Sequence, residues 1–176
     1  MNINFETRRL TTDDLGDLRD IAEETFLDTF ASQNKPENIE AYVAATFSVE
    51  RVEKELANEH SEFYFIETAS SIAGYLKLNQ GGAQTEQDLA NALEIERIYI
   101  RRSFQGTGAG RALMHLAIEV ANTANVDWIW LGVWDQNTRA IEFYRKSGFV
   151  EFGQHDFHMG NELQHDIMMK LALNNG

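Results

Sequence analysis

A glycine-rich segment, RRSFQGTGAGRALM at residues 101–114, stands between an apolar strand-like run and an apolar helix-like run. Gly106, Gly108 and Gly110 fall within five consecutive positions. A turn of this kind at a helix N-terminus presents backbone N–H groups without intrahelical partners, together with the positive end of the helix dipole. Glycine in a helix costs about 1 kcal/mol relative to alanine, so three glycines indicate a use. The segment therefore predicts a cradle for a phosphate-bearing ligand.

The spacing excludes two common nucleotide-binding loops. A P-loop requires lysine and then serine or threonine after its last glycine, whereas Gly110 is followed by Arg111 and Ala112. A dinucleotide-binding fingerprint requires G-x-G-x-x-G, and neither glycine pair here has its third glycine. A flexible turn without a ligand is the structural alternative.

Two motifs resemble the signatures of one enzyme superfamily. Residues 105–110, QGTGAG, are similar to the (Arg/Gln)-x-x-Gly-x-(Gly/Ala) pattern of the GNAT superfamily of acyl-CoA N-acyltransferases, whose loop binds the CoA pyrophosphate. WDQNTRAIEFYRKSGF, residues 134–149, resembles the second signature, N-x-x-A-x-x-F-Y-x-K-x-G-F. The segments QNKPENIEAYV, EIERIYI and WLGVWDQN and the H-x-F-x-x-G pattern near the end resemble the PaiA-type polyamine acetyltransferases. This resemblance extends over nearly the whole chain.

The resemblance implies a GNAT fold, of the α/β (α+β) class, with residues 1–176 forming one domain. Its central sheet is expected to be mixed and mostly antiparallel, with about seven strands flanked by helices. A splayed pair of parallel strands is expected in the middle of that sheet.

Acetyl-CoA is the co-substrate that the resemblance implies. Strand backbone at residues 98–100 is expected along the pantetheine arm, and the glycine loop around the diphosphate. Asn137 is expected to cap a helix and to offer its amide to the pantetheine. The full expected set is Ile98, Tyr99, Ile100, Arg101, Gln105, Gly106, Thr107, Gly108, Ala109, Gly110, Arg111, Asn137, Ala140, Tyr144 and Lys146.

Acetyl transfer to an amine needs a neutral amine and a proton for the departing thiolate. A primary amine with a pKa of about 10.4 is only about one part in 2,500 neutral at pH 7. Glu96 matches the family carboxylate that takes this proton, directly or through water, and Tyr144 matches the tyrosine that protonates the thiolate. Glu94 shares the strand face of Glu96 unless a bulge intervenes, so both are expected to bind the substrate. A solvated strand face and a packed tyrosine ring are the structural alternatives.

The absence of cysteine excludes a disulfide framework, a thiolate metal site and a cysteine nucleophile. The chain also lacks a G-x-S-x-G motif, so direct attack of the amine in a ternary complex is expected. No metal is expected, because the five histidines show no metal-ligand spacing.

Hydrophobic periodicity and turn residues predict the elements that position these side chains. Strands are expected at residues 3–10, 62–68, 72–79, 94–100, 128–133, 149–157 and 164–173. Helices are expected after Thr11 or Thr12, from Pro36, after Ser48, after the glycine loop, and from Asn137 to a C-cap at Gly148. Residues 80–92 are expected to form a polar loop, with or without a short helix.

The net charge of −13 is spread along the chain, which disfavours nucleic acid and favours a cationic small molecule, although solubility alone accounts for it. No stretch approaches the roughly 18 apolar residues of a membrane span, and the N-terminus lacks a signal pattern. We therefore expect a cytoplasmic protein with no membrane partner; a homodimer is compatible with the sequence.

The leading hypothesis is an N-acetyltransferase acting on a polyamine such as spermidine or spermine. The alternatives are an acetyltransferase for protein N-termini, lysine or another small amine, and a non-catalytic module that senses CoA.

Overall fold

The computed structural model describes residues 2–173; residue 1 and residues 174–176, at the ends of the expected domain, lie outside the described residues. The strands are β1 Glu6–Arg9, β2 Ser61–Glu67, β3 Ile72–Gln80, β4 Ala92–Ile100, β5 Trp128–Trp134, β6 Val150–Met159 and β7 Glu162–Ala172. The helices are α1 Leu15–Phe30, α2 Pro36–Thr46, α3 Val49–Leu56, α4 Ala109–Thr123 and α5 Thr138–Lys146. Short 3-10 turns are η1 Thr12–Asp14, η2 Ala31–Gln33, η3 Gly81–Ala83 and η4 Arg102–Phe104. Within residues 2–173, no helix is both long and apolar enough to span a membrane.

The seven strands form one sheet in the order β1-β2-β3-β4-β5-β7-β6. Every neighbouring pair is antiparallel except β4 and β5, which confirms the expected mixed sheet with a central parallel pair. That pair extends only from Ala92 beside Trp128 to Ile95 beside Leu131. Beyond it, β4 continues beside β3 and β5 continues beside β7, so the two strands diverge. We call this divergence the fork.

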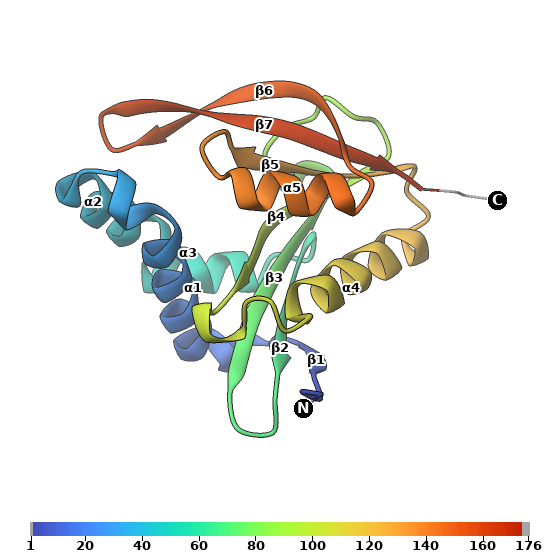
Figure 1. Ribbon diagram of the computed structural model, residues 1–176, viewed down its shortest axis with the longest axis horizontal. Helices are drawn as coiled ribbons and strands as arrows, with labels where there is room; N and C mark the ends of the chain where they lie inside the picture. The colour runs from blue at the N-terminus through green and yellow to red at the C-terminus, as the bar shows by residue number, and fades with distance from the viewer. Residues whose placement is uncertain (1, 174–176) are drawn as a thin grey trace.

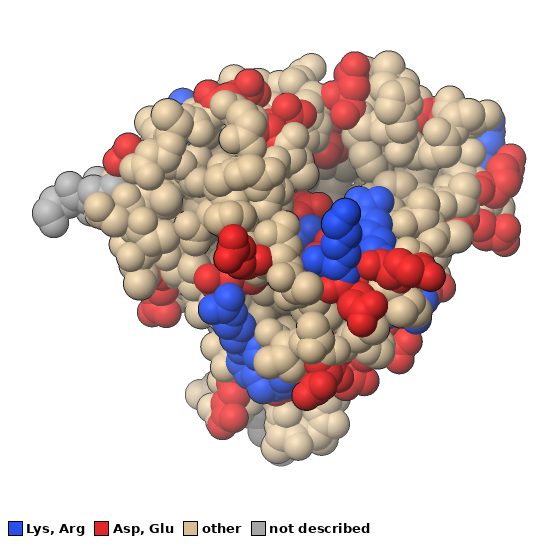
Figure 2. Space-filling view, turned by 180° about the vertical axis from the view of Figure 1, so that it is seen from behind, with Lys and Arg blue, Asp and Glu red and all other residues tan. Residues whose placement is uncertain are grey.

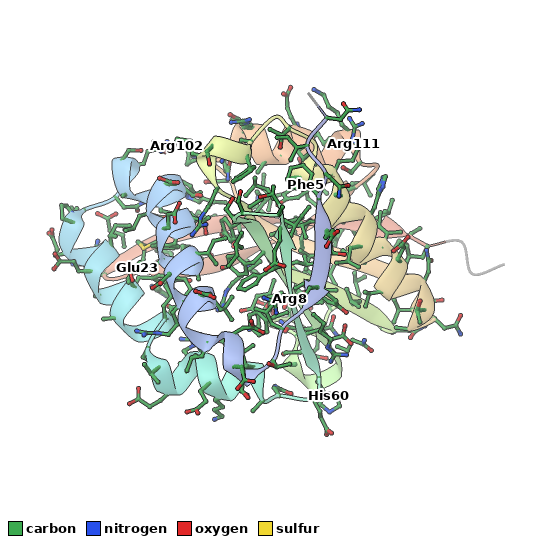
Figure 3. The ribbon with its side chains drawn as sticks, turned by 90° about the horizontal axis from the view of Figure 1, so that it is seen from below. Phe5, Arg8, Glu23, His60, Arg102 and Arg111 are labelled. Carbon is green, nitrogen blue, oxygen red and sulfur yellow. The ribbon has the colours of Figure 1, made fainter. Side chains whose placement is uncertain are left out.

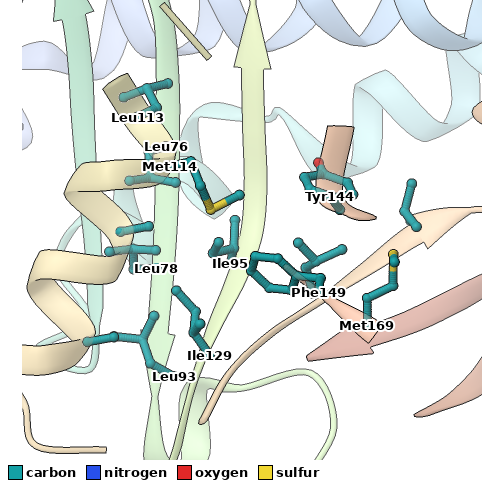
Figure 4. Close-up of a cluster of buried hydrophobic side chains, with 14 of the residues drawn as sticks. Leu76, Leu78, Leu93, Ile95, Leu113, Met114, Ile129, Tyr144, Phe149 and Met169 are labelled. Carbon is teal, nitrogen blue, oxygen red and sulfur yellow. The ribbon is translucent and has the colours of Figure 1, made fainter. Parts of the chain in front are cut away.

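Helices cover both faces of the sheet, and two apolar clusters fill the layers. On one face, α4 and α5 pack on strand residues such as Leu78, Ile95 and Ile129 (Figure 4). On the other face, α1 to α3 pack on Phe63, Phe65 and other strand residues. Figure 1 shows α4 and the α1 to α3 group on opposite sides of the central strands. The fork therefore opens between two helical layers.

Local sequence signals position several element ends as expected. Pro36 is the first residue of α2, and the Ser48 hydroxyl accepts a hydrogen bond from Arg51 N at 3.3 Å to cap α3. Gly148 follows α5 with a φ of +98°, as a left-handed C-cap requires. The first strand is shorter than expected, because Thr11 caps the 3-10 turn η1 that precedes α1.

The β6–β7 hairpin reaches across to α2 (Figure 1). Gly160, at its tip, has a φ of +61°, and a Cβ there would lie 2.3 Å from Asn38 Oδ1. Lys35 Nζ and Glu162 Oε1 form an ion pair at 3.1 Å beside it. The last hairpin of the chain is thus packed against its early helices.

Candidate active site

One cleft of about 860 Å³ joins the glycine loop, the fork and the α1 to α3 face of the sheet. It brings together most residues that the sequence assigned to cofactor or substrate. Those lining it are Glu94, Glu96, Ile98, Tyr99, Ile100, Gln105, Gly106, Gly108, Gly110, Arg111, Asn137, Ala140 and Tyr144. The cleft therefore has a glycine-loop half and, beyond the fork, a second half that we call the acceptor half.

The glycine loop has the geometry of an anion cradle. Gly106 and Gly108 have φ values of +77° and +96°, which L side chains rarely adopt. Apart from the chain neighbours of each glycine, a Cβ at either position would meet no atom of residues 2–173 within 4 Å, so the loop backbone is open to a ligand. Helix α4 begins at Ala109, and its first amides have no carbonyl one turn back to accept them. These features fit the diphosphate of CoA.

Arg139 is a cation of this half that the sequence reasoning missed. Its Nη1 donates to Gln105 Oε1 at 2.8 Å, and Gln105 Nε2 donates to Ile100 O at 3.2 Å. Gln105 thus braces the loop between β4 and α5. The signal available in the sequence was the place of Arg139 in the first turn of a helix capped by Asn137, whose Oδ1 accepts from Ala140 N at 3.2 Å.

Four residues expected to bind CoA do not line the cleft. Arg101 Nε donates to Glu24 Oε2 at 3.0 Å and its Nη1 donates to Ile72 O at 2.8 Å, so its guanidinium is engaged beside β3. Lys146 is the exposed last residue of α5. Thr107 and Ala109 also lie outside the cleft wall. Figure 3 shows Arg111 and Arg102 at the two sides of the glycine loop, and only Arg111 lines the cleft.

Tyr144 lies on α5 at the edge of the buried cluster (Figure 4). Its ring packs against Phe143 and Phe149, with centroids 5.5 and 6.1 Å away. Burial raises the pKa of the phenol, so it holds its proton at neutral pH. Beyond Ile95, no strand within residues 2–173 pairs with the β4 backbone that faces β5, which leaves this backbone available to an extended ligand arm.

Glu96 belongs to a buried network of four charges. The β3–β4 register shifts at this point, with Lys77 opposite Arg97 and Leu78 opposite Ile95, so Glu96 is the extra residue of a bulge. Its carboxylate pairs with Lys77 and, at 3.6 Å, with Arg97 Nη2. Glu55 accepts from Arg97 Nη1 at 3.0 Å and lies 3.3 Å from Lys77 Nζ. Two buried cations therefore face two carboxylates, and the half-exposed Arg51 adds a third pair, with its Nε 3.2 Å from Glu55 Oε1.

This network makes Glu96 a weaker proton acceptor than the sequence implied. Burial acts to raise the pKa of Glu96, but Arg97 and Lys77 outweigh it and lower the pKa. Lys77 was overlooked by the sequence reasoning, although a lysine within the apolar run IAGYLKLNQ indicates a buried ion pair.

Glu94 lies with Glu96 despite the bulge, because Asn79 Nδ2 donates to both carboxylates, at 2.9 and 2.7 Å. The Glu94 carboxylate is buried and also accepts from Thr85 N and Thr85 Oγ1. It thereby anchors residues 81–91 to the sheet, and Gln84 Oε1 adds a hydrogen bond from Trp130 Nε1 at 2.8 Å. Glu94 therefore anchors residues 81–91, in addition to the substrate-binding role that the sequence predicts for it.

A histidine between two carboxylates borders the acceptor half. His155 Nε2 lies 3.0 Å from Asp166 Oδ2, and His155 Nδ1 lies 3.3 Å from Glu86 Oε1. The hydrogen bond with Asp166 raises the pKa of His155, although burial acts against it. The sequence reasoning weighed His155 only as a metal ligand. Within residues 2–173, no group of three or more His, Asp or Glu side chains is arranged to hold a metal ion.

Aromatic and acidic side chains make up much of the rest of the acceptor half, which Arg51 and Arg97 also line. Phe26 and Tyr42 are stacked with centroids 4.6 Å apart, and Tyr42 meets Phe157 edge-on at 5.7 Å. The acidic residues lining the whole cleft are Asp28, Glu86, Glu94, Glu96, Asp156 and Asp166. Figure 2 shows acidic side chains scattered over one face of the molecule, with basic side chains grouped beside its hollow. The net charge of −13 makes the overall field negative, which favours cations.

Comparison with known proteins gives concordant results. The model of the Acetyltransferase (GNAT) family matches residues 16–149. An uncharacterized N-acetyltransferase of Lactobacillus delbrueckii subsp. lactis is 40% identical over 160 residues, which cover 91% of this chain and 92% of that protein. A spermidine N(1)-acetyltransferase of Thermoplasma acidophilum is 25% identical, over 84% of this chain and 89% of its own. The crystal structure of PaiA N-acetyltransferase from Thermoplasma acidophilum with coenzyme A superposes with a TM-score of 0.78, at 24% identity over 97% of this chain and 100% of that one.

Proposed function

Since the chain belongs to the acetyltransferase (GNAT) family and is an acetyl-CoA-dependent N-acetyltransferase, we propose that its acceptor is a polyamine such as spermidine or spermine. The acetyl group goes to a terminal primary amine by direct attack in a ternary complex. The observation that supports this acceptor most strongly is the combination of carboxylates and stacked aromatic rings in the acceptor half. Carboxylates attract the ammonium groups, and aromatic faces bind both cations and methylene chains.

We assign a task to each part of the cleft. The loop amides of Gly106, Gly108, Gly110 and Arg111 and the Arg111 and Arg139 guanidinium groups hold the CoA diphosphate. The unpaired edge of β4 at residues 98–100 aligns the pantetheine, with Asn137 and Ala140 on the opposite wall. The thioester then lies at the fork, where the Tyr144 hydroxyl supplies a proton to the departing thiolate. Glu96, balanced by Lys77 and Arg97, borders the reacting atoms as a fixed carboxylate.

The contact between the β6–β7 hairpin and α2 favours a slender acceptor over a folded protein. Gly160 packs on Asn38, and Gln164 Nε2 donates to Asn34 Oδ1 at 2.5 Å. These contacts join two walls of the acceptor half. An amine on a flexible chain can thread between them, and a lysine or N-terminus on a compact domain has less room.

An acceptor panel tests the proposal. Acetyl-CoA consumption is measured with spermidine, spermine, a lysine peptide, an aminoglycoside and butylamine, the last being a primary amine without a second ammonium. We expect kcat/KM for the polyamines to exceed that for butylamine by at least about tenfold, since one well-placed ammonium contributes about 1.4 kcal/mol or more. Butylamine turnover equal to that of spermidine, or faster turnover of the peptide, would overturn the polyamine acceptor.

The variant Tyr144→Phe tests the assigned chemistry separately. An enzyme that uses the Tyr144 hydroxyl loses kcat while its CoA affinity, measured by calorimetry, is unchanged. An unchanged kcat would remove the hydroxyl from the mechanism.

A further inference from the structure

The imidazole of His155 connects the cleft with a more exposed carboxylate. Its Nε2 lies 3.0 Å from Asp166 Oδ2, and its Nδ1 lies 3.3 Å from Glu86 Oε1. Nδ1 is fully buried and has no hydrogen-bond partner among the described residues, so the contact with Glu86 is one of charge and not of aligned donor and acceptor. The side chain of Glu86 is 39% exposed, against 19% for both His155 and Asp166.

This pair of side chains lies directly over the fork. Gly132 is the first residue of β5 after the last parallel pair, Ile95 and Leu131. A Cβ on Gly132 would lie 3.2 Å from Cε1 and 3.3 Å from Nε2 of His155, and 3.4 Å from Asp166 Oδ2. The missing side chain at position 132 therefore lets the imidazole and the carboxylate rest on the sheet at the point where β4 and β5 separate.

The reaction needs a proton acceptor that Glu96 does not provide well. Lys77 and Arg97 neutralise Glu96 and lower its pKa, whereas the amine must lose a proton at neutral pH. A catalytic base works best when its pKa is close to the pH of operation, and an imidazole meets that condition.

We infer that His155 is the base of the acetyl transfer and that Asp166 holds the incoming ammonium against it. This inference rests on the proposed transfer to an amine. In the free site Nε2–H donates to Asp166, because a carboxylate only accepts. The accepting form of the imidazole is the tautomer that keeps its proton on Nδ1, beside Glu86, while the ammonium takes the place of Nε2–H as the donor to Asp166. The ammonium N–H bond breaks, its proton passes to Nε2, and the resulting imidazolium is flanked by Asp166 and Glu86. The neutral amine then forms a bond to the acetyl carbon as the carbon–sulfur bond breaks. The thiolate takes the Tyr144 proton, and the second amine proton passes through water to the Tyr144 phenolate, which restores the phenol. The imidazolium releases the first amine proton to water beside Glu86.

The groups around His155 determine how the rate depends on pH. Asp166 faces it from β7, Glu86 from residues 81–91 and Glu94 from β4, and each carboxylate acts to raise its pKa. Only the neutral imidazole accepts a proton, so the rate falls as the pH drops below this raised pKa. Removing a carboxylate lowers the pKa and moves that acidic limb to lower pH.

The test measures kcat, KM and the pH profile of kcat/KM for His155→Gln, Asp166→Asn and a control, His165→Gln. His165 forms a similar pair, with its Nδ1 2.9 Å from Asp156 Oδ1, but it does not line the cleft. The acceptor used is the amine of the panel that the unsubstituted enzyme turns over fastest. The test of His155 can therefore be carried out even if that amine is not a polyamine. CoA affinity by calorimetry shows whether each variant is folded.

We expect His155→Gln to lose about 100-fold or more in kcat at pH 7, with CoA affinity retained. Its rate should recover toward that of the unsubstituted enzyme as the pH approaches 10, because the amine then loses its proton unaided. Asp166→Asn should move the acidic limb to lower pH, and His165→Gln should behave as the unsubstituted enzyme. The assignment would be overturned if His155→Gln lost as much kcat near pH 10 as at pH 7. It would also be overturned if the acidic limb of the kcat/KM profile did not move in Asp166→Asn, and this second measurement applies even if His155→Gln does not fold.

Discussion

Replacing Lys77 with methionine tests the buried charge network directly. Lys77 Nζ lies 3.3 Å from Glu55 and also pairs with Glu96, and its side chain is only 6% exposed. At an effective dielectric constant of about 20, one contact at 3.3 Å corresponds to roughly 5 kcal/mol of attraction, offset by the desolvation of the ions. Methionine keeps most of the volume and removes the charge, which leaves the two carboxylates with Arg97 and, on the exposed side of Glu55, with Arg51.

We expect Lys77→Met to lower the free energy of unfolding by about 3–5 kcal/mol at pH 8, as measured by urea denaturation. For a chain of this length the thermal midpoint should fall by roughly 6–20 °C. The loss should be smaller at pH 5, because the carboxylate freed of Lys77 has a higher pKa and takes up a proton more readily.

Lys35→Met is the matched control, since Lys35 forms a comparable 3.1 Å pair with Glu162 while 59% exposed. Exposed pairs contribute less than about 1 kcal/mol. If both methionine variants unfold at the same urea concentration, the buried network does not stabilise the fold and the reasoning is refuted.

Three further outcomes follow from the same structure. Gly74→Ala should destabilise the protein by more than 1 kcal/mol in urea denaturation, as its Cβ would lie 2.4 Å from a backbone oxygen of β4; an unchanged midpoint would contradict this. Gly108→Ala and Gly81→Ala both place alanine at positive φ and should each cost about 1–2 kcal/mol of stability, but calorimetry should show weaker CoA binding only for Gly108→Ala. The pKa values of Glu55 and Glu96 are lower in the folded protein than their unfolded value near 4.5. The stability that these carboxylates contribute is therefore present above pH 4.5 and should be lost as the pH falls through their folded pKa values. Urea midpoints that do not change between pH 5 and pH 3 would exclude this contribution.

Much of the fold was predictable because its signals are local. The apolar run of β5 and the turn residues of the two hairpins identify strands, and Pro36, Ser48 and Asn137 mark helix starts. The conformation of the glycine loop was also predictable from the sequence, because positive φ values and an open helix N-terminus depend on neighbouring residues only.

The acceptor half was less predictable because its groups meet only through tertiary structure. His155 and Asp166 lie on paired strands, but Glu86 comes from a loop about 70 residues earlier, held there by Glu94. The bulge at Glu96 depends on register with β3, which strand periodicity does not report. A prediction based on residue spacing therefore did not identify charge partners such as Lys77.

The packing of the final hairpin on α2 has a consequence for biosynthesis. Phe26 and Tyr42 are synthesised more than 100 residues before Phe157 and Asp166. The acceptor half thus combines segments that leave the ribosome at well-separated times. A nascent chain that has folded its glycine loop still lacks this half of the cleft until β6 and β7 have been made and have packed on α2.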